Sequence, residues 1–247
     1  SAASDVYKRQ SHLFPDLGVG VLRFQDKTVV LKNGPSGGLH GHPDKLSISI
    51  HDGRKEILPD LGTTAYGVPD CYAWYQKTIS HNTVTVDRKN QNAVGEKISL
   101  FEPTFNGGKI EASSENAYPG VKMCRSLSLD GLNLTDRFTC ESEEEHVYDY
   151  TLILRDSVAL PAARCDTLPE YERISNVSKG CGDGSCFFEL RDGTKLILNL
   201  SVPYELYTGV APGIPPKGLT PGEDVYPLIV RVKGKKLDIE VIWKLVE

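Results

Sequence analysis

The sequence lacks the features that mark several common protein classes. No apolar run approaches the length of a membrane-spanning helix, and no segment sustains a helical periodicity. The formal net charge is −5, which argues against a dominant basic surface for nucleic acid or for an anionic membrane. The N-terminus has neither a secretory apolar core nor an initiator methionine. We therefore expect neither nucleic acid nor a membrane among the partners.

The opening residues SAASDVYKRQ resemble translated adapter sequence more than the start of a natural protein. We predict that residues 1–13 are a non-native or disordered leader and that residues 14–247 form one folded domain. A foreign start makes the chain a fragment, so missing targeting signals carry no information on location. Periplasmic, secreted and cytoplasmic locations in a bacterium all stay open.

The cysteines leave two alternatives. They number six, which is an even count, but they are not spaced like a zinc ribbon. Cys181 and Cys186 flank the residues GDGS, which suits a hairpin closed by a disulfide. Free thiols in a reducing compartment are the other alternative.

Strand signals dominate the rest of the chain. Leu46, Ile48 and Ile50 alternate with polar residues, and the segment HNTVTVD repeats this period of two. Asp-Gly pairs at 130–131 and 192–193 separate further alternating runs, and we predict a third turn at Gly234. The segment DCYAWYQKTI fits a helix and a loop equally well, and the proline-rich residues 203–227 predict a long surface loop. The expected fold is an all-β antiparallel sandwich.

Histidines and acids gather in the first hundred residues. His42, Asp60 and His81 belong to three separate turns or strand ends, which a sheet could bring together. Two imidazoles and one carboxylate are a common zinc ligand set, so these three residues are a candidate zinc site. Asp44 is a competing ligand, although we expect it to cap the residues that follow. Widely spaced residues of these types are also common on surfaces without any metal.

Three blocks of sequence, GHGHPDKLSI, GRKEILPDLGTTAYG and WYQKTISHNTVTVDRKNQ, resemble successive motifs of the heparinase II/III-like polysaccharide lyases. This family includes heparin, heparan sulfate and alginate lyases. The resemblance is close over residues 38–91 and looser over the strand-rich remainder. It implies a β-sandwich that is normally preceded by an (α/α) toroid carrying further catalytic residues. Nothing helical precedes Phe14, so we expect that half to be missing and this chain to be nearly inactive alone.

The resemblance also implies roles for single residues. His40, the first histidine of the HGH motif, would face the uronic acid, and Tyr66 would be the sandwich-side catalytic tyrosine. His42, Asp60 and His81 would bind the structural zinc. Tyr72 and Tyr75 lie near Tyr66, and the loop length varies among relatives. An acidic, uronate-containing polysaccharide would be the substrate, and a homodimer is one further assembly that we consider.

These residue types suit a β-elimination. A lyase removes the proton at C5 of the uronate and expels the oxygen at C4, so the site must stabilise an enediolate. A base and an acid are needed close to the two carbons, and tyrosine and histidine can fill both roles. Because a tyrosine has a pKa of about 10, it needs nearby positive charge to act as a base at neutral pH.

Two other functions compete with the lyase. One is a zinc-stabilised carbohydrate-binding or interaction module without catalysis. The other is a zinc hydrolase, which would need an open fourth position on the metal. We expect His146 to make a structural hydrogen bond, His51 to face solvent, and the acidic run 141–145 to form a solvated bend.

Overall fold

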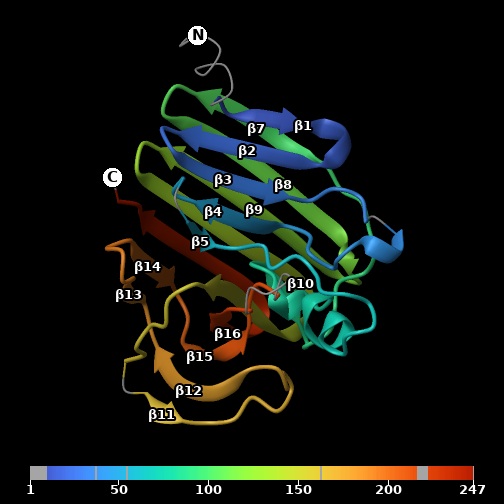
Figure 1. Cartoon of the computed structure of the whole chain (residues 1–247), viewed down its shortest axis with the longest axis vertical. Helices are drawn as coiled ribbons and strands as arrows, with labels where there is room; N and C mark the ends of the chain where they lie inside the picture. The colour runs from blue at the N-terminus through green and yellow to red at the C-terminus, as the bar shows by residue number, and fades with distance from the viewer. Residues whose placement is uncertain (1–9, 37, 54, 162, 216–221, 247) are drawn as a thin grey trace.

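The computed structural model describes residues 10–36, 38–53, 55–161, 163–215 and 222–246. Two antiparallel sheets stack face to face, as Figure 1 shows, so the predicted β-sandwich is confirmed. The smaller sheet has five strands in chain order. They are β1 (His12–Phe14), β2 (Val19–Phe24), β3 (Lys27–Lys32), β4 (Ser47–His51) and β5 (Glu56–Leu58). Strand β1 begins at His12 and pairs with β2, so the smaller sheet already includes part of the predicted leader.

The larger sheet has 11 strands, and its two longest strands, β10 and β16, pair along most of their length. Its first members are β6 (Val84–Val86), β7 (Ile98–Thr104), β8 (Gly107–Tyr118), β9 (Val121–Asp130) and β10 (Asn133–Leu154). The others are β11 (Arg164–Cys165), β12 (Ser175–Gly182), β13 (Ser185–Glu189), β14 (Lys195–Leu200), β15 (Tyr204–Pro212) and β16 (Asp224–Lys244). Strand β6 pairs with β10, and this pairing brings the segment just before β6 against the larger sheet.

The main core lies between the two sheets. Strand β2 packs on β7, β8 and β9, and Gly20 permits the close approach, because a Cβ there would lie 2.8 Å from Ile110 Cδ1. Alternating residues of β3 and β4, among them Leu31, Ile48 and Ile50, are buried in this core. Their burial agrees with the period of two read from the sequence.

A second core lies beneath the segment that joins β5 to β6. Leu61, Trp74 and Ile79 of this segment pack against residues of β10, β15 and β16. The short helices are η1 (Pro15–Leu17), η2 (Gly38–His40), the π-helix η3 (Cys71–Tyr75) and η4 (Thr78–Ser80). Among the described residues, no helix is long and apolar enough to cross a membrane.

The turns at Gly131 and Gly193 are confirmed, and both glycines have positive φ. The turn predicted at Gly234 is wrong, since β16 runs without a break through this glycine. Gly234 pairs with His146, next to a β-bulge that spans Glu141 to His146 in β10. The glycine therefore accommodates a bulge rather than a reversal of the chain, and the acidic run 141–145 forms that bulge.

Two other expectations need correction. The predicted loop over residues 203–227 is wrong for most of its length, because β15 ends only at Pro212 and β16 starts at Asp224. Residues 216–221 lie outside the described residues. Cys181 and Cys186 are free thiols, so the structure does not contain the disulfide considered between them. The strands on either side of the GDGS turn pair with other partners, which leaves no hairpin for a disulfide to close.

Candidate functional site

The topology of the smaller sheet gathers charged residues at one of its ends. Because β3, β4 and β5 are antiparallel neighbours, the end of β3, the start of β4 and the end of β5 share that end. Lys32 closes β3, Asp44 precedes β4, and Asp60 follows β5. The Lys32 ammonium forms an ion pair with Asp44 and lies 3.8 Å from an Asp60 carboxylate oxygen. In Figure 1 the η2 turn that precedes Asp44 lies on the same side of the molecule as η3 and η4.

Asn82 attaches the following motif to this end of the sheet. Its side-chain amide donates to the carbonyl oxygens of Ile48 (2.9 Å) and Pro59 (3.0 Å), and its oxygen accepts from the Ile153 amide (2.6 Å). One buried side chain therefore joins β4, the residue before Asp60, and β10. Its neighbour His81 is fixed beside the carboxylates as a result.

Arg125 of β9 hydrogen-bonds the segments on both sides of the site, one before β4 and one before β6. Its guanidinium is fully buried and donates to the carbonyl oxygens of Leu46 (2.7 Å) and Asn82 (2.5 Å). It also forms a bidentate pair with Asp136 at 2.8 and 2.6 Å, and Tyr150 donates to the same carboxylate. Leu46 has a φ of +58°, in the left-handed region that is unfavourable for a leucine. The arginine holds this strained residue between Asp44 and β4.

Three potential ligands meet where these segments converge. Single ligand atoms of Asp44, Asp60 and His81 lie within 4.8 Å of one another. The ring of His42 packs beside that of His81, with centroids 5.2 Å apart. His81 has only 2% of its surface exposed, and its Nε2 has no hydrogen-bond partner among the described residues. A buried, unpartnered imidazole nitrogen next to two carboxylates suits a metal ligand.

The electrostatics of the cluster favour ligand-competent forms. Burial lowers the pKa of His81 and of His42, so both imidazoles are neutral near pH 7. Burial acts to raise the pKa of Asp60, but His81, Lys32 and the Gly62 amide outweigh it and hold this pKa below its usual value. Burial likewise opposes the charge of Lys32, yet the nearby acids raise its pKa overall. Without a metal, Lys32 supplies the positive charge that the carboxylates need.

His40 and His42 point in different directions although a single glycine separates them. His42 is half-buried and faces His81, whereas His40 is exposed and its Nδ1 is hydrogen-bonded to the Tyr66 hydroxyl. The His40 and Tyr66 rings are 5.7 Å apart. The two residues to which we assigned catalysis are therefore neighbours, and His40 lines the same cavity as His42, Asp44 and Asp60.

A cavity of about 540 Å³ connects these groups. Its lining includes Lys32, His40, His42, Asp44 and Asp60. Two imidazoles, an ammonium and carboxylates thus share one solvent-accessible cavity, which suits the binding of a polar, charged ligand.

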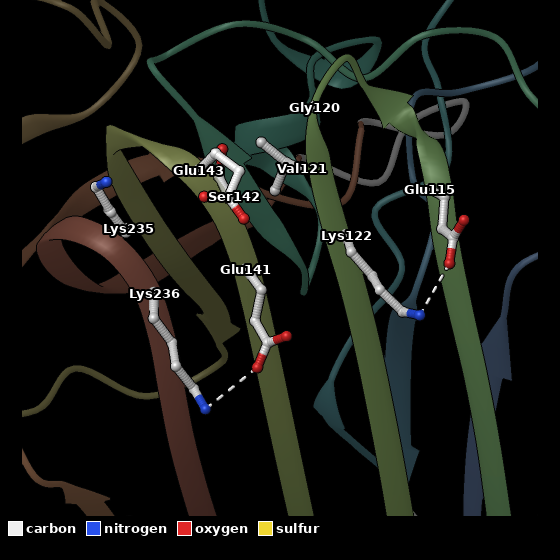
Figure 2. A pocket seen from close by; sticks show the side chains of 9 residues that line it. All are labelled: Glu115, Gly120, Val121, Lys122, Glu141, Ser142, Glu143, Lys235 and Lys236. Atoms are coloured by element: carbon white, nitrogen blue, oxygen red, sulfur yellow. Dashed lines mark ion pairs between the residues drawn. The ribbon is translucent and has the colours of Figure 1, made fainter.

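A second cavity, of about 570 Å³, lies over β8, β9, β10 and β16 (Figure 2). Two of its three lysines pair with acids on neighbouring strands, Lys122 with Glu115 at 2.9 Å and Lys236 with Glu141 at 3.2 Å. These exposed pairs leave little unbalanced charge for a ligand. We therefore place the candidate site in the first cavity.

Sequence reasoning singled out five site residues, His40, His42, Asp60, Tyr66 and His81, and the structure brings all of them to this end of the sandwich.

The sequence did not point to Lys32, and it pointed only weakly to Asp44, whose side chain makes ion pairs with Lys32 and Lys45. The Asp44 Oδ2 atom accepts no hydrogen bond from the backbone of the described residues, so the structure gives no support to the predicted capping role. His146 does make its expected structural hydrogen bond, to Asp87 at 2.8 Å.

Comparison with known proteins adds a family and several relatives. A family model described as heparinase II/III-like, C-terminal, matches residues 7–199. An exo-oligoalginate lyase from Saccharophagus degradans is 32% identical over 120 residues, which are 41% of this chain and 16% of the relative. A heparin-sulfate lyase from Bacteroides stercoris is 29% identical over 103 residues, or 40% of this chain and 15% of the relative.

Solved structures show the same fold. The heparan sulfate lyase HepC from Pedobacter heparinus superposes with a TM-score of 0.71 at 16% identity and covers 95% of this chain. A heparinase III superposes with a TM-score of 0.72 at 18% identity and covers 96% of this chain. This chain spans 36% of the length of each structure, and the matches span 15–18% of the curated relatives.

Proposed function

The chain belongs to the heparinase II/III-like C-terminal family, and we propose that it is the β-sandwich part of a polysaccharide lyase that cleaves a uronate-containing polysaccharide by β-elimination. One observation carries the proposal: the His40 imidazole and the Tyr66 hydroxyl are hydrogen-bonded to each other, and His40 lines the same cavity as the acid–imidazole cluster. The names of the relatives, which are alginate and heparin-sulfate lyases, support the reaction class.

The chemistry requires one group to accept a proton and another to donate one. The base takes the C5 proton of the uronate, the C4–O bond breaks, and a C4=C5 double bond forms. The departing oxygen receives a proton from the acid. His40 and Tyr66 can exchange a proton through their shared hydrogen bond, so each can restore the protonation state of the other. The Lys32 ammonium, which lines the same cavity, adds positive charge near the enediolate that develops.

We also propose a structural zinc ion at the cluster. His42, Asp60 and His81 are the ligands that we expect, and Asp44 lies within reach of the same position. The fit rests on the unpartnered Nε2 of His81 and on the neutral state that burial favours in both imidazoles. Zinc at this point would supply a fixed positive charge and hold the three segments together. Lys32 would then be released from the carboxylates.

The active site is completed, in this proposal, by an (α/α) toroid that belongs to the whole protein. The chain spans 36% of the similar lyase structures, and both His40 and Tyr66 are exposed to solvent. The toroid would cover these two residues and supply the remaining catalytic groups.

The test is to incubate the whole protein with a panel of polyuronates that includes alginate, heparan sulfate and hyaluronan. Ultraviolet absorbance of the conjugated, unsaturated uronate would then be followed. A rise in absorbance with at least one polymer is expected. Binding without any such rise, for every polymer, would favour a carbohydrate-binding module instead.

A further inference from the structure

Next to Tyr66 stands a second exposed aromatic side chain that the proposed chemistry does not use. Tyr72 has 56% of its surface exposed and Tyr66 has 45%. Their ring centroids are 6.4 Å apart with an interplanar angle of 33°, and Tyr66 in turn lies beside His40. Three aromatic rings therefore lie next to one another, beginning with His40, which lines the cavity. Exposed aromatic rings in a row are unusual on a surface that binds nothing.

The support beneath Tyr72 is rigid. Tyr72 belongs to the π-helix η3, whose residues Cys71, Trp74 and Tyr75 are buried. Trp74 Nε1 donates to the Pro212 carbonyl at 2.7 Å, and the Tyr75 hydroxyl donates to the Gly213 carbonyl at 2.8 Å. These bonds attach the helix to the end of β15. The outward position of Tyr72 is thus fixed by the fold, and π-helices are frequent at functional sites.

We propose that Tyr72, together with Tyr66, forms a stacking platform for a sugar ring next to the uronate that is cleaved. The inference rests on the proposed function, since it extends the same cavity by one binding position. A pyranose offers a face of C–H groups that packs against an aromatic ring, while its hydroxyl and carboxylate groups remain in water. A tyrosine suits this task because its ring is apolar and its hydroxyl tip can stay hydrated.

A stacking role and a catalytic role of Tyr72 depend on different parts of its side chain. A platform needs the ring of Tyr72 but not its oxygen, whereas a catalytic tyrosine needs the oxygen. Tyr72→Phe and Tyr72→Ala therefore separate the two roles. Phe187, on β13, has 54% of its surface exposed and provides the matched control as an exposed aromatic residue away from the site.

The experiment measures binding of alginate and heparan sulfate oligosaccharides of increasing length to this chain by calorimetric titration. Tyr72→Ala should weaken binding of the longer oligosaccharides about tenfold, as expected when one stacking ring is lost. Tyr72→Phe and Phe187→Ala should bind like the wild type. The midpoint of thermal unfolding should not change in Tyr72→Ala, because the ring is exposed.

Three results would overturn the platform. Unchanged affinity in Tyr72→Ala would remove its role in binding, and an equal loss in Tyr72→Phe would assign the role to the hydroxyl group. Failure of the wild-type chain to bind any oligosaccharide would also exclude the platform. None of these results decides the proposed lyase function, which depends separately on unsaturated product from the whole protein.

Discussion

His40 and His42 divide two tasks between neighbouring positions of one turn. His42 packs against His81 inside the cluster, and His40 reaches outward to Tyr66. We predict that His40→Ala in the whole protein lowers turnover by roughly 100-fold or more, the usual range for loss of a proton-transferring group. Zinc content and the midpoint of thermal unfolding should stay near the wild-type values. His51→Ala, on the same sheet, should preserve turnover, and loss of zinc in His40→Ala would refute the division.

The proposed metal ligands can be tested in the same way. We predict that His81→Ala and His42→Ala bind less zinc than the wild type, as measured by elemental analysis. A chelator should lower the midpoint of thermal unfolding of the wild type but leave that of the two variants unchanged. Asp44→Asn is the informative comparison, because Asp44 shares the cluster with Asp60 and His81. Unchanged zinc in His42→Ala, combined with loss in Asp44→Asn, would transfer the ligand role to Asp44.

The sequence could predict the residue types of the site but not all of its members. His42, Asp60 and His81 stand out because their motifs precede or follow clear strand patterns. Lys32 ends an ordinary alternating strand, KTVVLK, and no local signal distinguishes it from a solvated lysine. Its role depends on the pairing of β3 with β4, which is a long-range property of the fold.

At the scale of elements, buried polar side chains hold the segments that carry the site. Arg125 pairs with Asp136 and also binds the carbonyl oxygens of Leu46 and Asn82. We predict that Arg125→Met lowers the free energy of unfolding by about 3–5 kcal/mol, because it leaves the Asp136 carboxylate buried without a positive charge to pair with. Chemical denaturation would measure the change.

Arg137→Met is the matched control for this variant. Arg137 lies on the neighbouring strand β10 and pairs with Asp238 at 2.9 Å, but both side chains are partly exposed. Its loss should cost less than about 1 kcal/mol. Equal costs for the two arginines would show that Arg125 contributes no more than a surface ion pair.

A second set of polar contacts, centred on the Asp87 carboxylate, stabilises the turn that follows β6. Asp87 and Arg88 both have positive φ, and the Asp87 carboxylate accepts from the Val147 amide at 3.0 Å and contacts His146 at 2.8 Å. Burial acts to raise the pKa of Asp87, but the Val147 amide and His146 outweigh it and lower this pKa below its usual value. The ionised carboxylate therefore stabilises the fold above the unfolded-state pKa of about 3.9, and this stabilisation is lost as the pH falls through the lower folded-state value.

We predict that Asp87→Asn destabilises the protein most at neutral pH. The difference in unfolding free energy between the variant and the wild type should shrink as the pH falls below about 4, because the wild-type carboxyl then loses its charge as well. Denaturant titrations at a series of pH values would show this. A difference that does not vary with pH would mean that the charge of Asp87 is irrelevant.

Period-two patterns predicted the strands well, since alternation reports directly on a half-buried sheet. They predicted the strand limits less well. Gly234 is a residue type typical of turns, yet the pairing of β16 with β10 continues past it. Residues 204–212 form a strand, although the prolines around them indicated a loop. The prolines lie close to the ends of β15 and β16, where a missing backbone donor is tolerated.

At the scale of the whole molecule, the chain covers only part of the lyase structures that it resembles. The sandwich carries His40, Tyr66 and the acid–imidazole cluster, and the similar lyase structures are nearly three times as long as the part that this chain covers. The stability of the chain does not depend on a partner for its main core, because both sheets bury their facing residues against each other. In the proposed function, a further domain of the whole protein would complete the substrate cleft.

The mass of the products formed in water labelled with heavy oxygen tests the central claim most directly. The whole protein would digest the polyuronate that it cleaves best, and the fragments would be weighed by mass spectrometry. β-Elimination predicts a non-reducing end that is lighter by one water and contains no heavy oxygen from the cleavage. Fragments that carry the full mass of a saturated sugar plus one heavy oxygen per cut would show hydrolysis and contradict the account.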